Sequence, residues 1–177
     1  MAAVLSGMMD DTDRVAFTVG ESKKSGLIVG SPNICQSEYE FSITDNKTII
    51  YGLGAIKGVG ESLVRAIVLE REKNGSYDDI FDFCLRIEKK YLNRRAVEAL
   101  IYSGAFDVFG VNRATLIATY PRAIKQAEQR QNDLSKGQVS LFSEVKSHIE
   151  YEKNYIKGEY LPLKNILMLE KSVMGYY

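Results

Sequence analysis

The spacing of apolar residues divides the chain into a short helical part, a β-rich part and a longer helical part. Positions 1–9 are mostly apolar and predict a short helix, and a second helix is predicted over about 13–25. Strand character is found at 27–29, 39–43 and 48–51, and turn residues lie between the last two segments. The pattern therefore predicts a small sheet whose last two strands form a β-hairpin.

Apolar residues that recur every three or four positions predict further helices beyond this sheet. These helices are expected at 61–73, 80–87, 94–103, from 113 onward, and from about 164 to the end. Ser76, Asn93 and Asn112 stand where helix caps are expected, and Pro121 predicts a kink or a restart in the long helix. Residues 129–164 are mainly polar. The expected fold is mainly α with a small β-hairpin.

A glycine-rich turn precedes the helix predicted from residue 61. Gly58 and Gly60 lack the side chains that would block a close approach, and the helix start leaves backbone N–H groups without intrahelical partners. Such a turn can bind a phosphate at the positive end of the helix dipole, and Lys57 adds a charge. For one isolated copy, a plain tight turn is the better explanation, since glycine turns are common. A second helix, glycine turn and helix at 104–107 favours two phosphate-binding units related by a pseudo-two-fold axis.

Composition restricts the possible functions. The 177 residues include 23 basic and 23 acidic side chains, so a protein that coats nucleic acid non-specifically is not indicated. Cys35 and Cys84 have no partners at metal-ligand spacing and are expected to be reduced thiols. The acidic run at 10–13 could bind magnesium, but capping of the following helix is the simpler interpretation. His148 is expected on the surface, and no apolar run is long enough to cross a membrane.

Several motifs together resemble one protein family. They are residues 51–60 (YGLGAIKGVG), 81–84 (FDFC), 93–95 (NRR), 98–101 (EALI) and 104–107 (GAFD). This combination resembles the tandem helix-hairpin-helix region of bacterial replicative C-family polymerases, the DNA polymerase III alpha subunits. The resemblance departs from the family pattern at two places. Only Pro32 stands where the family often has two prolines, and Pro121 lies where no proline is expected.

The resemblance implies that the chain is a part of a longer protein and that it contains four regions. It divides the chain into the end of the fingers region (1–45), a tandem helix-hairpin-helix domain (46–128), a polar linker (129–165) and the start of a helix leading to an OB-fold domain (166–177). The catalytic aspartates that bind Mg²⁺ for nucleotidyl transfer would lie upstream, so this part would contain neither catalytic residues nor a metal or other cofactor.

The resemblance also implies binding to double-stranded DNA, largely independent of sequence, in a bacterial cytoplasmic protein. Other subunits of the polymerase holoenzyme are implied partners, and a membrane is not. The residues expected to contact DNA are Lys57, Gly58, Val59, Gly60, Arg94, Arg95, Gly104 and Arg113.

A pentapeptide in the polar linker resembles the sliding-clamp-binding consensus of this family. It consists of Gln138, Val139, Ser140, Leu141 and Phe142. Leu141 and Phe142 would fill an apolar cleft on the β sliding clamp, and Gln138 would satisfy polar groups at its edge. The alternative is a loop whose Leu-Phe pair packs on its own domain.

Two other functions compete with DNA binding and clamp tethering. The hairpins could be scaffold in a clamp or replisome interaction module that never contacts DNA, which the zero net charge favours. A helix-hairpin-helix nuclease or glycosylase would need catalytic carboxylates or a catalytic lysine in context, and the single acidic run at 10–13 argues against it.

Overall fold

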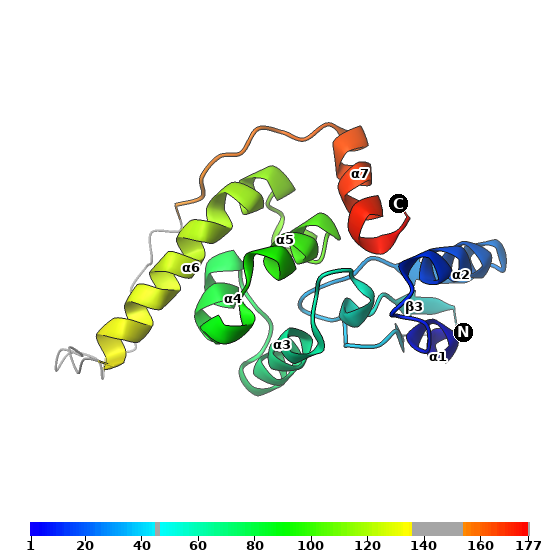
Figure 1. Ribbon diagram of the computed structural model, residues 1–177, viewed down its shortest axis with the longest axis horizontal. Coiled ribbons are helices and arrows are strands. Elements are labelled where there is room, and N and C mark those ends of the chain that lie inside the picture. Colours follow the sequence, from blue (N-terminus) through cyan, green and yellow to red (C-terminus); the bar gives the residue numbers. More distant parts are fainter. Residues whose placement is uncertain (45–46, 136–153, 177) are drawn as a thin grey trace.

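The computed structural model describes residues 1–44, 47–135 and 154–176. This part of the chain contains the helices α1 (Ala2–Ser6), α2 (Thr12–Lys24), α3 (Glu61–Asn74), α4 (Ile80–Arg86), α5 (Arg94–Tyr102), α6 (Arg113–Ser135) and α7 (Leu163–Met174). The strands are β1 (Ile28–Gly30), β2 (Ser42–Ile43) and β3 (Thr48–Ile50). The α6 helix lies at one end of the molecule and α1, α2 and the sheet at the other, with α3, α4 and α5 between them (Figure 1). The predicted fold class is confirmed.

The three strands form one sheet in the order β1-β3-β2. Antiparallel pairing of β2 with β3 places Ser42 opposite Ile50, so the expected β-hairpin is confirmed. The β1 strand pairs with β3 in parallel and places Ile28 opposite Thr48. Since β3 is the central strand, its residues Ile49 and Ile50 are buried, and it leads the chain directly into the glycine turn.

Side-chain caps set several helix starts, as the sequence predicts. The Asp11 carboxylate accepts a hydrogen bond from the Arg14 N–H at the start of α2, which supports capping as the role of the acidic run. Asn93 caps α5 in the same way, through the Ala96 N–H. The expectation for Ser76 is wrong, because Asp79 caps α4 by accepting from two backbone N–H groups.

The long helix α6 continues through Pro121, so of the predicted kink or restart the restart does not occur. Proline removes one backbone hydrogen bond, but burial of Leu116, Tyr120 and Ala123 against the rest of the protein holds both halves in one helix. The helix also extends to Ser135, so the polar stretch expected as linker from residue 129 begins as helix.

The segment that precedes α7 runs back along α6. The Ile156 N–H donates to the Thr119 hydroxyl at 3.0 Å, and the Gly158 N–H donates to the Thr115 hydroxyl at 3.0 Å. A Cβ built on Gly158 would lie within 2.4 Å of the Ala114 carbonyl oxygen, so this position needs glycine for packing. Part of the predicted polar linker is therefore bound to α6.

One hydrophobic core joins the sheet to the helices and includes residues from Ala2 to Met174. Phe83 is at its centre, where its ring lies edge-on to Tyr77 (centroids 5.2 Å apart) and to Phe106 (5.0 Å). The Cys84 thiol is also buried in it. Both glycine turns contribute residues to this core, Val59 from the first and Ala105 and Phe106 from the second.

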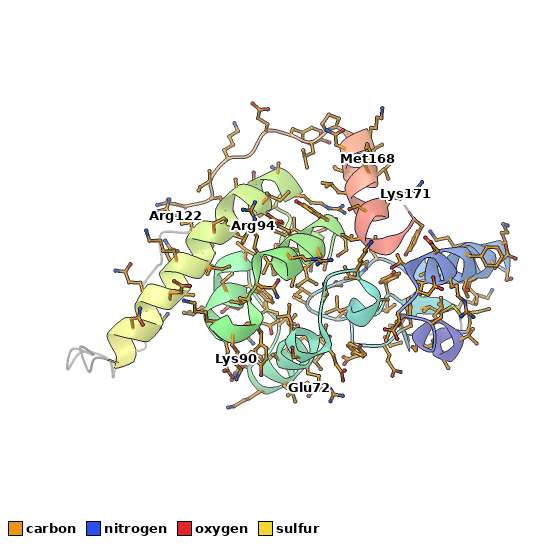
Figure 2. The ribbon with its side chains drawn as sticks, in the orientation of Figure 1. Glu72, Lys90, Arg94, Arg122, Met168 and Lys171 are labelled. Carbon is orange, nitrogen blue, oxygen red and sulfur yellow. The ribbon has the colours of Figure 1, made fainter. Side chains whose placement is uncertain are left out.

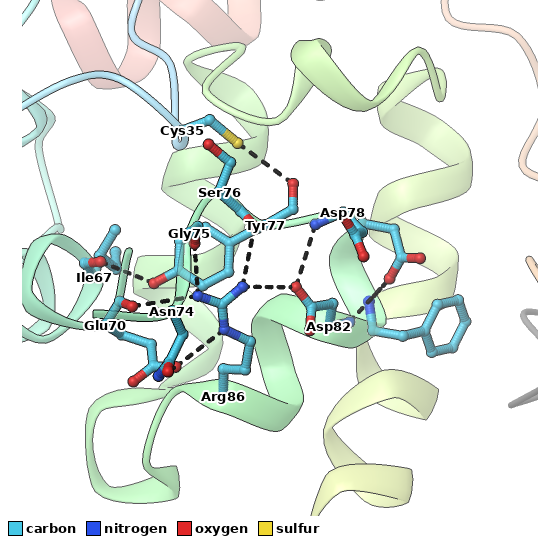
Figure 3. A network of polar contacts seen from close by, with 12 residues as sticks. Cys35, Ile67, Glu70, Asn74, Gly75, Ser76, Tyr77, Asp78, Asp82 and Arg86 are labelled. Carbon is cyan, nitrogen blue, oxygen red and sulfur yellow. Dashed lines mark hydrogen bonds and ion pairs between the residues drawn. The ribbon is translucent and has the colours of Figure 1, made fainter. Parts of the chain in front are cut away.

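The guanidinium of Arg86 holds the turn between α3 and α4 (Figure 3). It donates to the Glu70 carboxylate at 3.0 Å, to the Asp82 carboxylate at 3.0 Å and to the Gly75 carbonyl at 2.7 Å. It also lies over the Tyr77 ring, 4.5 Å from its centroid. Because nearly all its donors are used inside the protein, we assign Arg86 to the fold and not to ligand binding.

Candidate nucleic-acid interface

The first glycine turn, residues 57–60, is called hairpin 1 below. The Val59 N–H donates to the Ile56 carbonyl at 3.0 Å, and Gly58 adopts a φ of +96°, which favours glycine. Val59 is buried and anchors the turn to the core, so it supports the interface from below. Gly60 is the residue before α3 and is exposed.

Gly60 is a glycine that the fold itself does not require. Its φ is −85°, which any residue can adopt, and a Cβ built there would meet nothing within 4 Å. No side chain caps α3, and the N–H groups of Gly58, Gly60 and Ser62 have no acceptor among the described residues. Hairpin 1 therefore presents open backbone donors at the positive end of a helix dipole.

Arg95 brings a positive charge to these donors. A Cβ built on Gly58 would lie 3.3 Å from the Arg95 Nε, so the arginine passes directly over the turn. Its side chain is exposed and has no ion pair or hydrogen bond within the described part of the chain. The neighbouring Arg94 is exposed as well, and it pairs with Glu98 at 2.8 Å. Of the two predicted DNA contacts at the start of α5, Arg95 is therefore the one that lies against hairpin 1, whereas the partner of Arg94, Glu98, also accepts a hydrogen bond from Tyr120 of α6.

Lys57 lies on the other side of hairpin 1. Together with Lys171 it lines a surface hollow of about 470 Å³ that also contains Asp10, Asp11 and Asp13. These carboxylates offset the charge of Lys57, so Arg95 offers an anion the more favourable field. Among the described residues, no group of three or more His, Cys, Asp or Glu side chains is arranged to hold a metal ion.

The second glycine turn, residues 104–107, is called hairpin 2 below, and it differs from hairpin 1. Gly104 has a φ of +84° but is buried, and its N–H donates to the Ile101 carbonyl. The Ala105 carbonyl accepts from the Ile34 N–H at 2.8 Å. A Cβ on Gly104 would lie 2.5 Å from the Arg113 Nη2, so a guanidinium covers this turn too.

The guanidinium that covers hairpin 2 is already paired. Arg113 donates to both carboxylate oxygens of Asp107 (3.0 and 2.7 Å), to Glu170 (2.8 Å) and to the Tyr102 carbonyl (2.9 Å). Its side chain is only 9% exposed. Of the predicted DNA contacts, Gly104 and Arg113 are therefore inside the protein and apart from the surface that hairpin 1 forms with Arg95. We assign both to the fold.

The predicted clamp-binding residues, 138–142, lie outside the described residues. Sequence reasoning missed Glu170, Thr115 and Thr119, which bind α7 and the segment before it to α6. Their partners are 37 to 57 residues away in the chain, and no local pattern marks such contacts.

The arrangement of a short 3₁₀ turn (Leu53–Ala55), a glycine hairpin and α3 is matched by a known sequence family. The family described as helix-hairpin-helix motif matches residues 26–116, which include both hairpins. The chain belongs to the helix-hairpin-helix family.

Curated relatives of this helix-hairpin-helix chain share one name. Over 178 aligned residues it is 39% identical to DNA polymerase III subunit alpha of Pasteurella multocida, 40% to that of Vibrio cholerae and 39% to that of Escherichia coli K12. The alignments cover all of this chain but 15% of each relative. The resemblance inferred from the glycine turns is thereby confirmed. Within the described residues, no helix is long and apolar enough to span a membrane.

Proposed function

We propose that this chain binds the sugar-phosphate backbone of duplex DNA through hairpin 1 and the start of α5, as a non-catalytic segment of a bacterial replicative polymerase. The observation that carries the proposal is the juxtaposition of open N–H groups at Gly58 and Gly60 with the unpaired guanidinium of Arg95. Backbone amides at a helix start and a free arginine are both groups that bind phosphate.

Binding of this kind positions the protein without reading the base sequence. If Arg95, Arg94 and Lys57 neutralise two or three phosphates, log K should fall with log salt with a slope of about −1.8 to −2.7. Raising salt from about 50 to about 200 mM would then weaken binding by about 10- to 40-fold. In the longer relatives such a site would hold the duplex, and the chemistry of synthesis would occur elsewhere.

Hairpin 2 has a different role in this proposal. Its glycine is buried and its arginine is paired with two carboxylates, so it supports hairpin 1 from within the fold. The scaffold alternative, in which neither hairpin contacts DNA, is therefore kept for hairpin 2 alone, and hairpin 1 is the one that contacts DNA.

Tethering to the sliding clamp is the second part of the proposal. It is supported by the match of residues 138–142 to the clamp-binding consensus, between α6 and the segment that returns along it. A clamp peptide linked to a DNA-binding site raises the effective concentration of each for its partner. Loss of clamp binding in the double variant Leu141→Ala/Phe142→Ala, with duplex binding unchanged, is the expected result. Unchanged clamp binding would contradict the tether.

The DNA site is tested with Arg95→Gln. We expect the variant to bind a labelled duplex more weakly, with the salt slope reduced by about 0.9, because one phosphate contact is lost. Lys24→Gln removes the same charge from the far end of α2 and serves as the control. Equal salt slopes for Arg95→Gln and wild type would contradict the assignment of Arg95 as a phosphate contact. Absence of any duplex binding, with clamp binding retained, would select the scaffold alternative.

A further inference from the structure

The α7 helix contacts both hairpins near its C-terminal end, through one side chain and one backbone carbonyl. At hairpin 1, the Lys57 N–H donates to the Val173 carbonyl at 2.9 Å. At hairpin 2, the Glu170 carboxylate accepts from Arg113 at 2.8 Å. Glu170 and Val173 both lie near the C-terminal end of α7, which ends at Met174. The helix packs against α5 and α2, and it lies between them in Figure 1.

The contact with Lys57 uses a carbonyl that the helix itself leaves unpaired. The last four carbonyls of an α-helix have no intrahelical partner, and α7 ends at Met174. Val173 is buried, so its carbonyl needs a hydrogen-bond donor from within the protein, and the Lys57 N–H is that donor. The first residue of hairpin 1 is thereby attached to the end of α7, and the start of α3 fixes the other end of the hairpin.

The contact with Arg113 determines where α7 lies. Arg113 is held over Gly104 by Asp107 and by the Tyr102 carbonyl, independently of α7. The ion pair with Glu170 is largely buried, with side-chain exposures of 9% and 19%. A buried carboxylate that pairs with a guanidinium must lie where it can accept the guanidinium's hydrogen bonds. The Arg113–Glu170 pair therefore sets the position of α7 relative to hairpin 2.

We infer that Glu170 is a positioning residue for hairpin 1, which it holds in its DNA-binding form through Arg113, α7 and the Val173 carbonyl. The expected effect of Glu170 on DNA affinity rests on the proposed function. Its expected effect on the conformation of hairpin 1 does not. Removing the Glu170 charge leaves Arg113 paired with Asp107 and leaves Val173 and Met174 buried, so we expect the protein to stay folded while the ion pair that positions α7 is lost.

The test compares Glu170→Gln with Glu72→Gln. Glu72 is exposed on α3, on the opposite side of the molecule from α7 (Figure 2). Both changes remove one negative charge, which by electrostatics alone should strengthen binding to anionic DNA. If Glu170 positions hairpin 1, Glu170→Gln should instead weaken duplex binding, whereas Glu72→Gln should not. We expect about a threefold to tenfold loss of duplex affinity and about tenfold faster hydrogen exchange at the Lys57 amide, with exchange in α4 and α5 unchanged.

The outcomes separate this inference from the proposed function. Unchanged exchange at the Lys57 amide in Glu170→Gln would overturn the positioning role, whatever happens to DNA binding. Faster exchange with affinity equal to that of Glu72→Gln would overturn the link to DNA. If wild type binds no duplex, the proposed function fails, and faster exchange at Lys57 still supports the role of Glu170 in holding hairpin 1.

Discussion

Replacing Gly60 by aspartate should stabilise the protein and weaken DNA binding at the same time. Gly60 is the N-cap residue of α3, has an extended backbone and leaves open space where a Cβ would stand. An aspartate fits there without strain and can accept from the free N–H groups of the first turn. The capped Ser62 N–H lies next to the Gly58 and Gly60 N–H groups that we assign to phosphate, so the carboxylate of a cap at residue 60 competes with the ligand and repels it.

The expected magnitudes follow from this geometry. Aspartate in place of glycine at an N-cap contributes a few tenths of a kcal/mol, and its charge at the helix start contributes about 0.3–1 kcal/mol. The adjacent Glu61 carboxylate reduces this gain, although Glu61 is paired with Arg65. We expect about 0.5 kcal/mol of added stability. Loss of one charge-assisted hydrogen bond to phosphate costs about 1.5–3 kcal/mol, which is a tenfold or larger loss of affinity.

Urea unfolding followed by circular dichroism measures the stability, and fluorescence anisotropy with a labelled duplex measures the affinity. Gly60→Asn is the matched control, because asparagine caps the helix but does not repel phosphate. Its affinity should lie between those of wild type and Gly60→Asp. A stabilised Gly60→Asp variant with wild-type affinity at low salt would refute the assignment of these amides to DNA.

Two further predictions concern the core and its polar network. Burial opposes ionisation of Glu70, but hydrogen bonds from Asn74 and Arg86 outweigh it, so the pKa of Glu70 in the folded protein lies below its usual 4.5. The contribution of Glu70 to the free energy of unfolding is complete above about pH 4.5 and is lost as the pH falls through the lower folded pKa. Urea titrations at several pH values should therefore show a smaller loss of stability at acid pH for Glu70→Gln than for wild type. Burial raises the pKa of the Cys84 thiol to about 12. Iodoacetamide near neutral pH should therefore modify the half-buried Cys35 first, and peptide mapping that finds Cys84 alkylated in the native protein at the same rate would contradict this burial.

Local features of the fold could be predicted because their causes are local. Asp11 and Asn93 cap helices by bonding backbone groups three residues on, and the β-hairpin follows from a turn between two short strands. The cap of α4 was not foreseen, because the residue that accepts from the Phe81 and Asp82 N–H groups is Asp79, directly before the helix, in place of Ser76. The helix through Pro121 could not be foreseen either, since burial on both sides of the proline holds it together.

The unequal roles of the hairpins depend on contacts between distant residues. In the sequence, Gly58 and Gly104 stand in similar contexts, and each turns out to have an arginine over it. Only the structure shows that Arg113 is paired with Glu170, 57 residues away, whereas Arg95 is free for a ligand. The difference between the paired Arg113 and the unpaired Arg95 could not be predicted from composition or residue spacing.

The central claim is that hairpin 1 contacts DNA and hairpin 2 does not. The direct measurement is a titration of the isotope-labelled protein with duplex DNA, followed by the amide chemical shifts of both hairpins. We expect the Gly58 and Gly60 amides to shift in a salt-dependent way, while those of Gly104 and Ala105 stay in place. Shifts at Gly104 equal to those at Gly58, or no shift at either glycine, would contradict the account.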